Sequence, residues 1–307
     1  MTYVPSMTGE STPASAASRC GTVALAGRSN VGKSTLLNRL LGAKVAITSP
    51  KPQTTRSRIL GIRSLPSAQM VLLDTPGIHR ARSLLNRRMV EAAERTIVEA
   101  DAVVAVIDAN AGFTPSDREA VRRLAESRRP WLVAVNKIDL LSPAALLPLL
   151  DGIGKEFPGT DLVPVSAATG ENLAALEQAI VTRLPPGEPL YPADELTDQT
   201  ARILVQEFVR EQIFRATEGE IPYKTAVVVE GFEEKPTVNA VSATILVERQ
   251  SQKRILVGGG GAMIRKIGTR ARLELERFFG KRFYLDLFVK VRRDWSSNPR
   301  VLSELGL

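Results

Sequence analysis

The chain has 307 residues, which is enough for two domains that each bury their own core. Apolar residues make up 44% and charged residues 24%, a composition typical of globular, water-soluble proteins. One cysteine, Cys20, and one histidine, His79, exclude a disulfide framework and any metal site built from several Cys or His ligands. Because the sequence has neither an apolar run of the ~20 residues needed to cross a bilayer nor a signal-peptide pattern, we expect a cytoplasmic protein.

The net charge of +8 is concentrated in one segment near the C-terminus. Residues 249–293 hold 13 Lys or Arg and 3 Asp or Glu, so this segment alone carries +10. A concentrated positive surface attracts a polyphosphate partner, because neutralised phosphates release their counterions. Taken alone, however, such a charge run more often forms a solvated face that binds nothing.

The first half of the chain predicts an α/β domain. Residues 1–18 are rich in Ser, Thr, Ala and Pro and cannot bury enough apolar surface to offset chain entropy, so we expect a disordered tail there. From 19 to 183, short apolar runs alternate with helical patterns, which predicts a mostly parallel sheet with helices on both faces. The runs at 103–107 and 132–135 are continuously apolar, as in central strands that are covered on both sides.

The first motif with chemistry follows the apolar run TVALA and opens a helical pattern. Its sequence GRSNVGKS (27–34) matches G-x-x-x-x-G-K-[ST], in which backbone N–H groups surround phosphates at a helix N-terminus. Lys33 is expected to reach the β and γ oxygens and Ser34 to coordinate Mg²⁺. The predicted phosphate-binding residues are Gly27, Ser29, Asn30, Val31, Gly32, Lys33, Ser34 and Thr35.

A second motif, DTPG (74–77), follows the apolar run MVLL. The Asp74 carboxylate therefore emerges at the carboxyl end of a buried strand, where such sheets bind nucleotides, and we expect it to hold Mg²⁺ through water. The Gly77 N–H is expected to bind the γ-phosphate and to release it as the loop moves. A Thr hydroxyl of QTTR (53–56) would complete the Mg²⁺ coordination. The sequence does not decide between Thr54 and Thr55, and we favour Thr55.

The third motif, NKID (136–139), ends the apolar run WLVAV and selects the base. An ionised Asp139 only accepts hydrogen bonds, so it pairs with the N1 and N2 donors of guanine. Adenine offers neither donor and would leave the carboxylate unpaired, so GTP is favoured over ATP. We expect Asn136 to bridge to the phosphate loop and Lys137 to lie along the base plane.

A weaker guanine-binding signal is the tripeptide Ser166-Ala167-Ala168, which follows the run LVPV. We expect the Ala167 N–H to donate to guanine O6. In this order, and each at the end of a strand, the four segments resemble the translation-factor-like GTPases. That resemblance implies hydrolysis of GTP to GDP and phosphate.

Catalysis is expected to be slow. Ile78 stands where Ras-like enzymes carry the Gln that orients the attacking water, and an isoleucine cannot do this. Intrinsic turnover should therefore be on the order of 10⁻⁴ to 10⁻² s⁻¹ without an activator. His79 is a weaker candidate than Asn30, whose side-chain carbonyl would hold K⁺ beside the phosphates. The predicted catalytic residues are Lys33, Thr55, Gly77 and Asn30.

A second, smaller α+β domain follows a Pro-rich linker. LPPGEPLYP (184–192) has four prolines in nine residues and cannot continue a helix or an interior strand. We place the linker at 184–196 and the second domain at 197–307. The predicted elements are helices at 200–214, 252–257 and 262–279, strands at 224–231, 238–248 and 283–291, and a glycine turn at 258–261.

The order strand, helix, G-x-x-G, helix, strand is that of a KH domain, whose glycine turn lets a nucleic-acid backbone approach closely. The helix at 262–279 carries basic residues outside its apolar face. The predicted RNA-binding residues are Gly258, Gly259, Gly260, Gly261, Arg265, Lys266, Arg270 and Arg272.

The combination of these GTPase motifs, the Pro-rich linker and a basic KH motif ending in VKVRRDW resembles the Era family of bacterial GTPases over residues 19–305. The resemblance implies a factor in small (30S) ribosomal subunit assembly that binds 16S rRNA near its 3′ end, with GTP controlling that affinity. Two positions depart from the family pattern. Gly259 and Gly260 leave the turn without the basic or polar side chain that relatives commonly carry, and Ser29 replaces a common Pro.

Two alternatives remain open. One is an RNA-binding placeholder in which the nucleotide is only structural. The other is a peripheral GTPase at the inner face of the cell membrane, which would use the basic surface on anionic lipid. In each case we expect a monomer.

Overall fold

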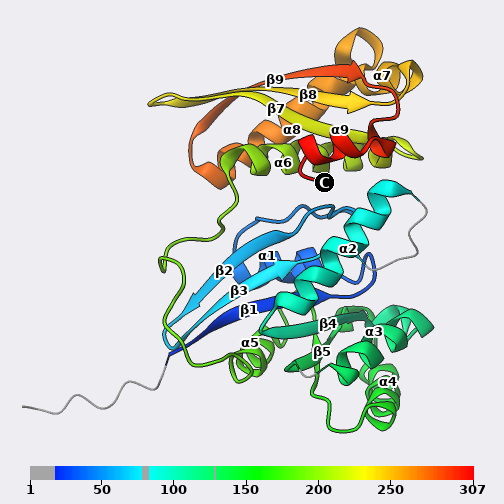
Figure 1. Cartoon of the computed structure of the whole chain (residues 1–307), viewed down its shortest axis with the longest axis vertical. Coiled ribbons are helices and arrows are strands. Elements are labelled where there is room, and N and C mark those ends of the chain that lie inside the picture. The colour runs from blue at the N-terminus through cyan, green and yellow to red at the C-terminus, as the bar shows by residue number, and fades with distance from the viewer. Residues whose placement is uncertain (1–17, 78–82, 128) are drawn as a thin grey trace, which may run out of the picture.

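The computed structural model describes residues 18–77, 83–127 and 129–307. Most of the predicted tail (1–18), together with Ile78 and His79, lies outside the described residues. The chain forms two units, each built around its own sheet, and they lie one above the other in Figure 1.

The first unit contains a six-stranded sheet in the order β2-β3-β1-β4-β5-β6. β2 runs antiparallel to β3, and the other neighbouring pairs are parallel. This confirms the predicted α/β fold with a mostly parallel sheet. The elements are β1 Arg19–Ala26, α1 Lys33–Leu41, β2 Ile59–Leu65, β3 Ala68–Asp74, α2 Leu84–Glu99, β4 Ala102–Asp108, η1 Ala109–Ala111, α3 Pro115–Glu126, β5 Trp131–Asn136, η2 Ile138–Leu140, α4 Pro143–Glu156, β6 Leu162–Val165 and α5 Leu173–Val181.

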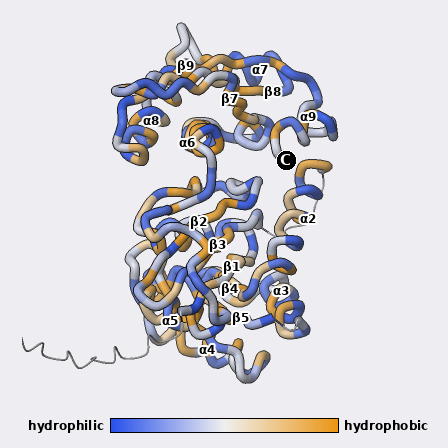
Figure 2. Tube along the Cα trace, turned by 60° about the vertical axis from the view of Figure 1, so that its left-hand side comes forward, coloured by the Kyte–Doolittle hydropathy of each residue, from blue (hydrophilic) through white to orange (hydrophobic). Residues whose placement is uncertain are grey.

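Helices cover both faces of this sheet because alternate residues of each strand point to opposite sides. In β4, Val104 and Val106 join a core with residues of α1 and α5, whereas Val103 and Ile107 join a second core with residues of α3 and α4. Figure 2 shows hydrophobic residues concentrated in the strands. Burial on both sides explains why these strands are continuously apolar.

The segment that follows α5 is attached to the first unit along β2 and β3. The Ile62 N–H donates to the Leu196 carbonyl (2.8 Å), and the Thr197 hydroxyl donates to the Leu60 carbonyl (2.6 Å). The Gln69 side chain accepts from the backbone N–H groups of Leu190 and Tyr191. The Pro-rich segment therefore has a defined course over the surface of the first unit.

The second unit is a three-stranded sheet in the order β7-β8-β9, with β7 antiparallel and β9 parallel to β8. Its elements are α6 Ala201–Ala216, η3 Ile221–Lys224, β7 Thr225–Glu234, β8 Val238–Val247, α7 Gln250–Val257, η4 Gly259–Gly261, α8 Ala262–Phe279, β9 Arg282–Val291, η5 Trp295–Ser297 and α9 Pro299–Glu304. This is the predicted α+β arrangement, with β7 longer than expected and a short final helix that the sequence patterns did not indicate.

Helix α6 lies between the two units. In both views it lies on the side of the second unit that faces the first (Figures 1 and 2). Its apolar residues join the core beneath α8 and the sheet, while Arg210, Glu211 and Gln212 are also buried. The two units also meet at α2, where Leu85 and Met89 of the first unit pack with Trp295 and α9 of the second. The second contact places α2, the helix that follows the DTPG motif in the chain, against the second unit.

Candidate functional site

The phosphate loop (27–32) connects β1 to α1 and requires glycine at two positions. Gly27 and Gly32 have φ values of 147° and 100°, which other residues rarely adopt. A Cβ atom on Gly27 would collide with the Val106 carbonyl, and one on Gly32 would collide with the Asn136 side chain. Gly77 also packs closely, since a Cβ there would lie 2.6 Å from the Ser29 nitrogen. The two loops therefore meet through backbone contact.

Lys33, the first residue of α1, is 6% exposed. Its amine donates to the carbonyls of Gly27 (3.0 Å) and Arg28 (2.8 Å), so it lies across the phosphate loop. Burial lowers the pKa of Lys33 to about 8, and the nearby Asp74 carboxylate opposes that change. A desolvated cation at a helix N-terminus is suited to bind a phosphate group.

Three oxygen-bearing side chains meet beside Lys33. The Ser34 hydroxyl donates to Asp74 Oδ2 (2.6 Å), and the Thr55 hydroxyl lies 3.0 Å from Ser34 Oγ and 3.1 Å from Asp74 Oδ2. Burial raises the pKa of Asp74, and Lys33 opposes this. Asp74 Oδ1 is buried and accepts no hydrogen bond from the residues described. A buried carboxylate with two hydroxyls is an oxygen ligand set that fits Mg²⁺.

The neighbouring Thr54 has different surroundings. Its hydroxyl donates to the Lys51 carbonyl (2.8 Å) within the same loop and makes none of the contacts that Thr55 makes. The structure thus brings Thr55, rather than Thr54, to Ser34 and Asp74.

At the end of the site that is expected to bind guanine, Asn136 connects the phosphate loop with the segment Ser166-Ala167-Ala168. Its Nδ2 donates to the Val31 carbonyl (2.8 Å), as expected, and its Oδ1 accepts from the Ala167 N–H (3.0 Å). That N–H, which we expected to face guanine O6, is therefore already bonded to a side chain. The next backbone donor, the Ala168 N–H, has no hydrogen-bond partner among the described residues. The Ser166 hydroxyl donates to Asp139 Oδ1 (2.6 Å) and orients that carboxylate.

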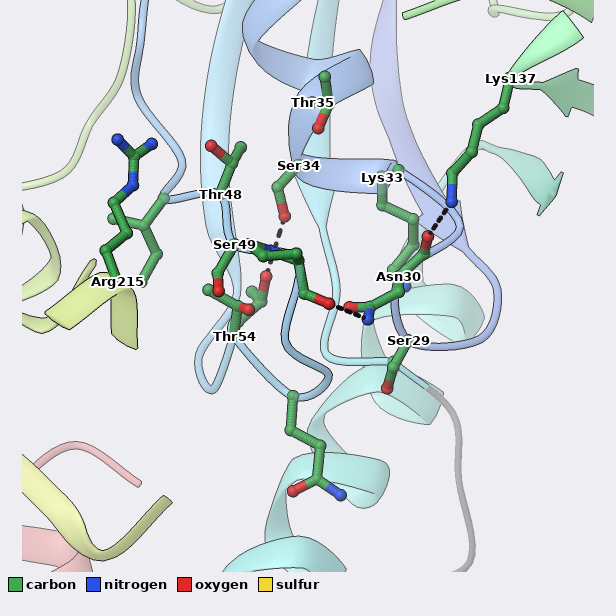
Figure 3. A pocket seen from close by; sticks show the side chains of 16 residues that line it. Ser29, Asn30, Lys33, Ser34, Thr35, Thr48, Ser49, Thr54, Lys137 and Arg215 are labelled. Carbon is green, nitrogen blue, oxygen red and sulfur yellow. Dashed lines mark hydrogen bonds between the residues drawn. The ribbon is translucent and has the colours of Figure 1, made fainter. Parts of the chain in front are cut away.

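Lys137 and Asn30 close the other side of the site. The Lys137 amine contacts the Asn30 carbonyl (2.7 Å) and Asp108 Oδ2 (2.5 Å). The Asn30 side chain donates from Nδ2 to the Pro50 carbonyl (2.7 Å), which connects the phosphate loop to the loop that carries Thr55 (Figure 3). Asn30 adopts a φ of 65°, a conformation that Asn tolerates better than most residues.

These residues border a cavity of about 520 Å³, within the size range of small-ligand sites. Figure 3 shows the side chains that line it. Predicted residues in its lining are Ser29, Asn30, Gly32, Lys33, Ser34, Thr35, Thr55, Gly77 and Lys137. Arg215, which no sequence motif indicated, reaches the cavity from α6 and pairs with Glu211 (2.7 Å). No local motif marks Arg215, because only the packing of the two units brings it there.

The predicted RNA face includes the glycine turn η4 at the start of α8. Gly258, Gly260 and Gly261 have φ values of 71°, 58° and 80°. A Cβ on Gly258 would lie 2.8 Å from the Met263 nitrogen, whereas Gly259 and Gly260 face open space.

The four predicted basic residues of α8 differ in their surroundings. Lys266 and Arg270 are exposed, and Arg265 donates to the Gly260 carbonyl (2.9 Å). Arg272 is half-buried and pairs with Glu276 (2.9 Å), so it is less available than expected. The exposed cations nevertheless flank the turn.

Comparison with known proteins identifies the family. A protein-family model described as 50S ribosome-binding GTPase matches residues 22–137, and the family model of the KH domain matches residues 220–296. GTPase Era of Geobacter metallireducens is 47% identical over 290 residues, which cover 94% of this chain and 97% of that protein. The chain belongs to the Era family of GTPases. GTPase Era of Azotobacter vinelandii is 44% identical over 290 residues, covering 94% and 96% of the two chains.

Two solved Era structures share the whole fold. An Era variant from Aquifex aeolicus bound to GDP·AlF4⁻ has a TM-score of 0.91 and 41% identity, covering 94% of this chain and 99% of that one. A structure of Era in complex with MgGDPNP and nucleotides 1506–1542 of 16S ribosomal RNA has a TM-score of 0.91, 42% identity and the same coverage. As an Era-family member, the chain is a GTPase with a KH domain.

Proposed function

We propose that this Era-family GTPase binds 16S rRNA near its 3′ end and acts in assembly of the small (30S) ribosomal subunit. The similar Era structure that contains MgGDPNP and 16S rRNA nucleotides supports this proposal. The observation that carries it is that one chain contains both kinds of site. The first domain holds a phosphate loop together with Asp139, the predicted guanine-binding carboxylate, and a glycine turn flanked by exposed cations follows in the second domain. We assign the GTPase domain to 19–183, the linker to 184–196 and the KH domain to 197–307.

The hydroxyls of Ser34 and Thr55, with Asp74 through water, would hold Mg²⁺, which neutralises charge on the β- and γ-phosphates when bound. Lys33 and the backbone N–H groups of residues 27–35 bind the phosphates. Thr55 and the Gly77 N–H form the part of the site that depends on the γ-phosphate. Loss of that phosphate therefore releases the loops that carry them.

Guanine recognition depends on Asp139, which accepts from N1 and N2 of the base. Asn136 keeps this end in register with the phosphate loop through its contact with Val31. We assign the O6 contact to the Ala168 N–H, because the Ala167 N–H already donates to Asn136.

A second cation, K⁺, is part of the proposal. Asn30 lines the cavity, and its Nδ2 donates to Pro50, while its Oδ1 accepts no hydrogen bond from the described residues. Asn30 Oδ1 would hold K⁺ beside the phosphates and stabilise charge that develops during hydrolysis. We expect turnover to be faster in K⁺ than in Na⁺ buffer; equal rates would count against this role.

For RNA binding we assign the turn Gly258–Gly261 with Arg265, Lys266 and Arg270, and give Arg272 a smaller part because it pairs with Glu276. The deciding experiment measures affinity for a 16S rRNA 3′-end fragment with a GTP analogue and with GDP, and compares wild type with Lys33→Ala. Lys33→Ala should abolish GTP hydrolysis and remove the difference in RNA affinity between the two nucleotide states. Equal RNA affinity of the wild type in both nucleotide states would instead support an RNA-binding placeholder.

We also propose that the protein acts as a monomer in the cytoplasm. None of the helices within the described ranges has the length and hydropathy of a membrane span. The basic face could still bind the anionic inner leaflet of the cell membrane. Salt-sensitive binding to anionic vesicles without preference for the rRNA fragment would favour that alternative.

A further inference from the structure

The loop between α1 and β2, residues 42–58 and here called the switch loop, is held from both sides. On its inner side, Pro50 accepts from Asn30 (2.7 Å), and Thr55 contacts Ser34 and Asp74. Its outer side contacts the KH domain. Lys44 pairs with Glu211 of α6 (2.6 Å), and the Lys51 amine donates to the Phe214 carbonyl (2.6 Å).

Arg56 makes the most extensive of these outer contacts. Although it belongs to the switch loop, it is only 4% exposed and its guanidinium lies inside the KH domain. Nη1 donates to the Thr225 carbonyl (2.6 Å), and Nη2 donates to the carbonyls of Tyr223 (2.9 Å) and Pro222 (3.1 Å). A buried cation is costly unless it is well paired, and three charge-assisted hydrogen bonds offset that cost.

The acceptors for Arg56 are held in place by the KH domain itself. The guanidinium carbon lies 5.8 Å from the centre of the Trp295 ring, which is fully buried. Trp295 Nε1 donates to the Lys224 carbonyl (3.2 Å), so the ring and the η3 carbonyls form one unit. A planar fork that both stacks and donates to several carbonyls is specific to arginine, and lysine cannot reproduce it.

Thr55 and Arg56 are consecutive residues whose side chains enter different domains. Thr55 contacts Asp74 in the GTPase domain, and Arg56 contacts Thr225 in the KH domain. Because consecutive Cα atoms are about 3.8 Å apart, a shift of the Arg56 acceptors must move Thr55 unless the loop deforms.

We propose that Arg56 is the positioning residue through which the KH domain holds Thr55 in the Mg²⁺- and GTP-binding position. This inference rests on the proposed function in one respect, the assignment of Thr55 to Mg²⁺. The coupling is reciprocal: rRNA that moves the KH domain changes the Mg²⁺ site, and Mg²⁺ with GTP changes how the KH domain is held.

The test uses the full-length chain and the Mg²⁺ concentration that gives half-maximal GTP hydrolysis. Arg56→Gln removes the charge and the fork, and Arg56→Lys keeps the charge without the fork. Both should raise this concentration, Arg56→Gln by about tenfold, within the usual range of coupling between sites. Thr55→Ala supplies the limit for complete loss of the hydroxyl. GDP affinity in EDTA should stay at the wild-type value, because that complex does not use Thr55.

Arg88→Gln is the matched control. Arg88 of α2 crosses the same domain boundary, donating to Ser303 Oγ (3.2 Å) and to the carbonyls of Pro299 (3.4 Å) and Leu307 (2.5 Å). It forms no hydrogen bond or ion pair with any described residue of the switch loop. Its Mg²⁺ dependence should match the wild type. An equal shift in Arg88→Gln would overturn the proposal, because any weakening of the interface would then have the same effect.

An unchanged Mg²⁺ dependence in Arg56→Gln would also overturn the proposal. If Arg56→Gln fails to fold, as judged by GDP binding, an unchanged Arg56→Lys has the same force, since the fork is lost in both. Failure of the proposed function gives a different pattern. There, wild-type rRNA affinity is independent of nucleotide, while the Mg²⁺ titrations still decide the role of Arg56.

Discussion

At the scale of single residues, the switch loop offers two hydroxyls in sequence that make different contacts. Thr55 contacts Ser34 and Asp74, whereas Thr54 donates to Lys51 within the loop. Thr55→Ala should therefore weaken Mg²⁺ binding in the GTP complex about tenfold, as losses around metal sites usually do. Thr54→Ala should leave Mg²⁺ binding unchanged and lower the free energy of unfolding by about 1 kcal/mol. Titrating Mg²⁺ into the GTP complex of each variant checks both; a larger effect at Thr54 would reverse the assignment.

The proposed role of Asp139 in base specificity makes a prediction of its own. In Asp139→Asn, the N1 and N2 donors of guanine would face an amide donor, and GTP affinity should fall about 100-fold. Xanthine carries a carbonyl in place of the 2-amino group, so xanthosine triphosphate should bind this variant better than GTP does. Calorimetry with GTP, ATP and xanthosine triphosphate measures this change in nucleotide preference. Unchanged GTP binding would contradict the role of the carboxylate.

Residue chemistry within motifs could be predicted, and contacts between distant segments could not. Lys33 and Ser34 are identifiable because they complete a G-x-x-x-x-G-K-[ST] motif that opens a helix. Asp74 and Asn136 are identifiable because each ends an apolar run, and parallel strands bring those ends to one edge. The partner of the Ala167 N–H was not foreseen, because it depends on the Asn136 rotamer. Arg215 was missed because helix packing alone brings it to the cavity.

At the scale of elements, the glycine turn before α8 contains one glycine that the backbone conformation requires and another that it does not. Gly258 has a positive φ, and a Cβ there would press on Met263, whereas Gly259 has open space around it and no positive φ. Gly258→Ala should therefore lower the free energy of unfolding by about 1–3 kcal/mol, the usual cost of a strained backbone. Gly259→Ala should stay within about 0.5 kcal/mol of wild type. Denaturant unfolding of the two variants makes the comparison; equal losses would show that the turn tolerates no side chain.

The same turn allows a gain of function. Gly259 has open space around it, so Gly259→Lys has room to place a cation at the turn. It should tighten binding of the 16S rRNA fragment and steepen its salt dependence by about one phosphate contact. Gly259→Gln is the neutral control, which should leave the salt slope unchanged. A Lys variant with the wild-type slope would mean that the turn does not approach the phosphates.

Element boundaries followed from periodicity where one face of the element meets water. Helix α8 was predicted over its observed span because its apolar residues recur at helical spacing. Helix α9 has only six residues, with Pro299 at its start, and is too short to show a period. β7 continues past Gly231 because β8 pairs with it up to Glu234, and that pairing is not encoded within β7 alone.

At the scale of the whole molecule, two domains could be expected from length and from the Pro-rich segment, but their contact could not. The interface buries Glu211 and Arg56, residues that a sequence pattern assigns to the surface. Both side chains have partners more than 150 positions away, since Glu211 pairs with Lys44 and Arg56 donates to the Thr225 carbonyl. No window along the chain contains that information.

This arrangement makes a thermodynamic prediction for the intact protein. If a GTP analogue changes affinity for the rRNA fragment by some factor, the fragment must change affinity for the analogue by the same factor, because both paths join the same states. We expect a factor of about 5 to 150, the usual range for coupled sites. Separate titrations of RNA into the nucleotide complex and of nucleotide into the RNA complex measure the two factors. Unequal values would require a further species, such as a dimer, and a common factor of one would mean that the domain contact carries no signal.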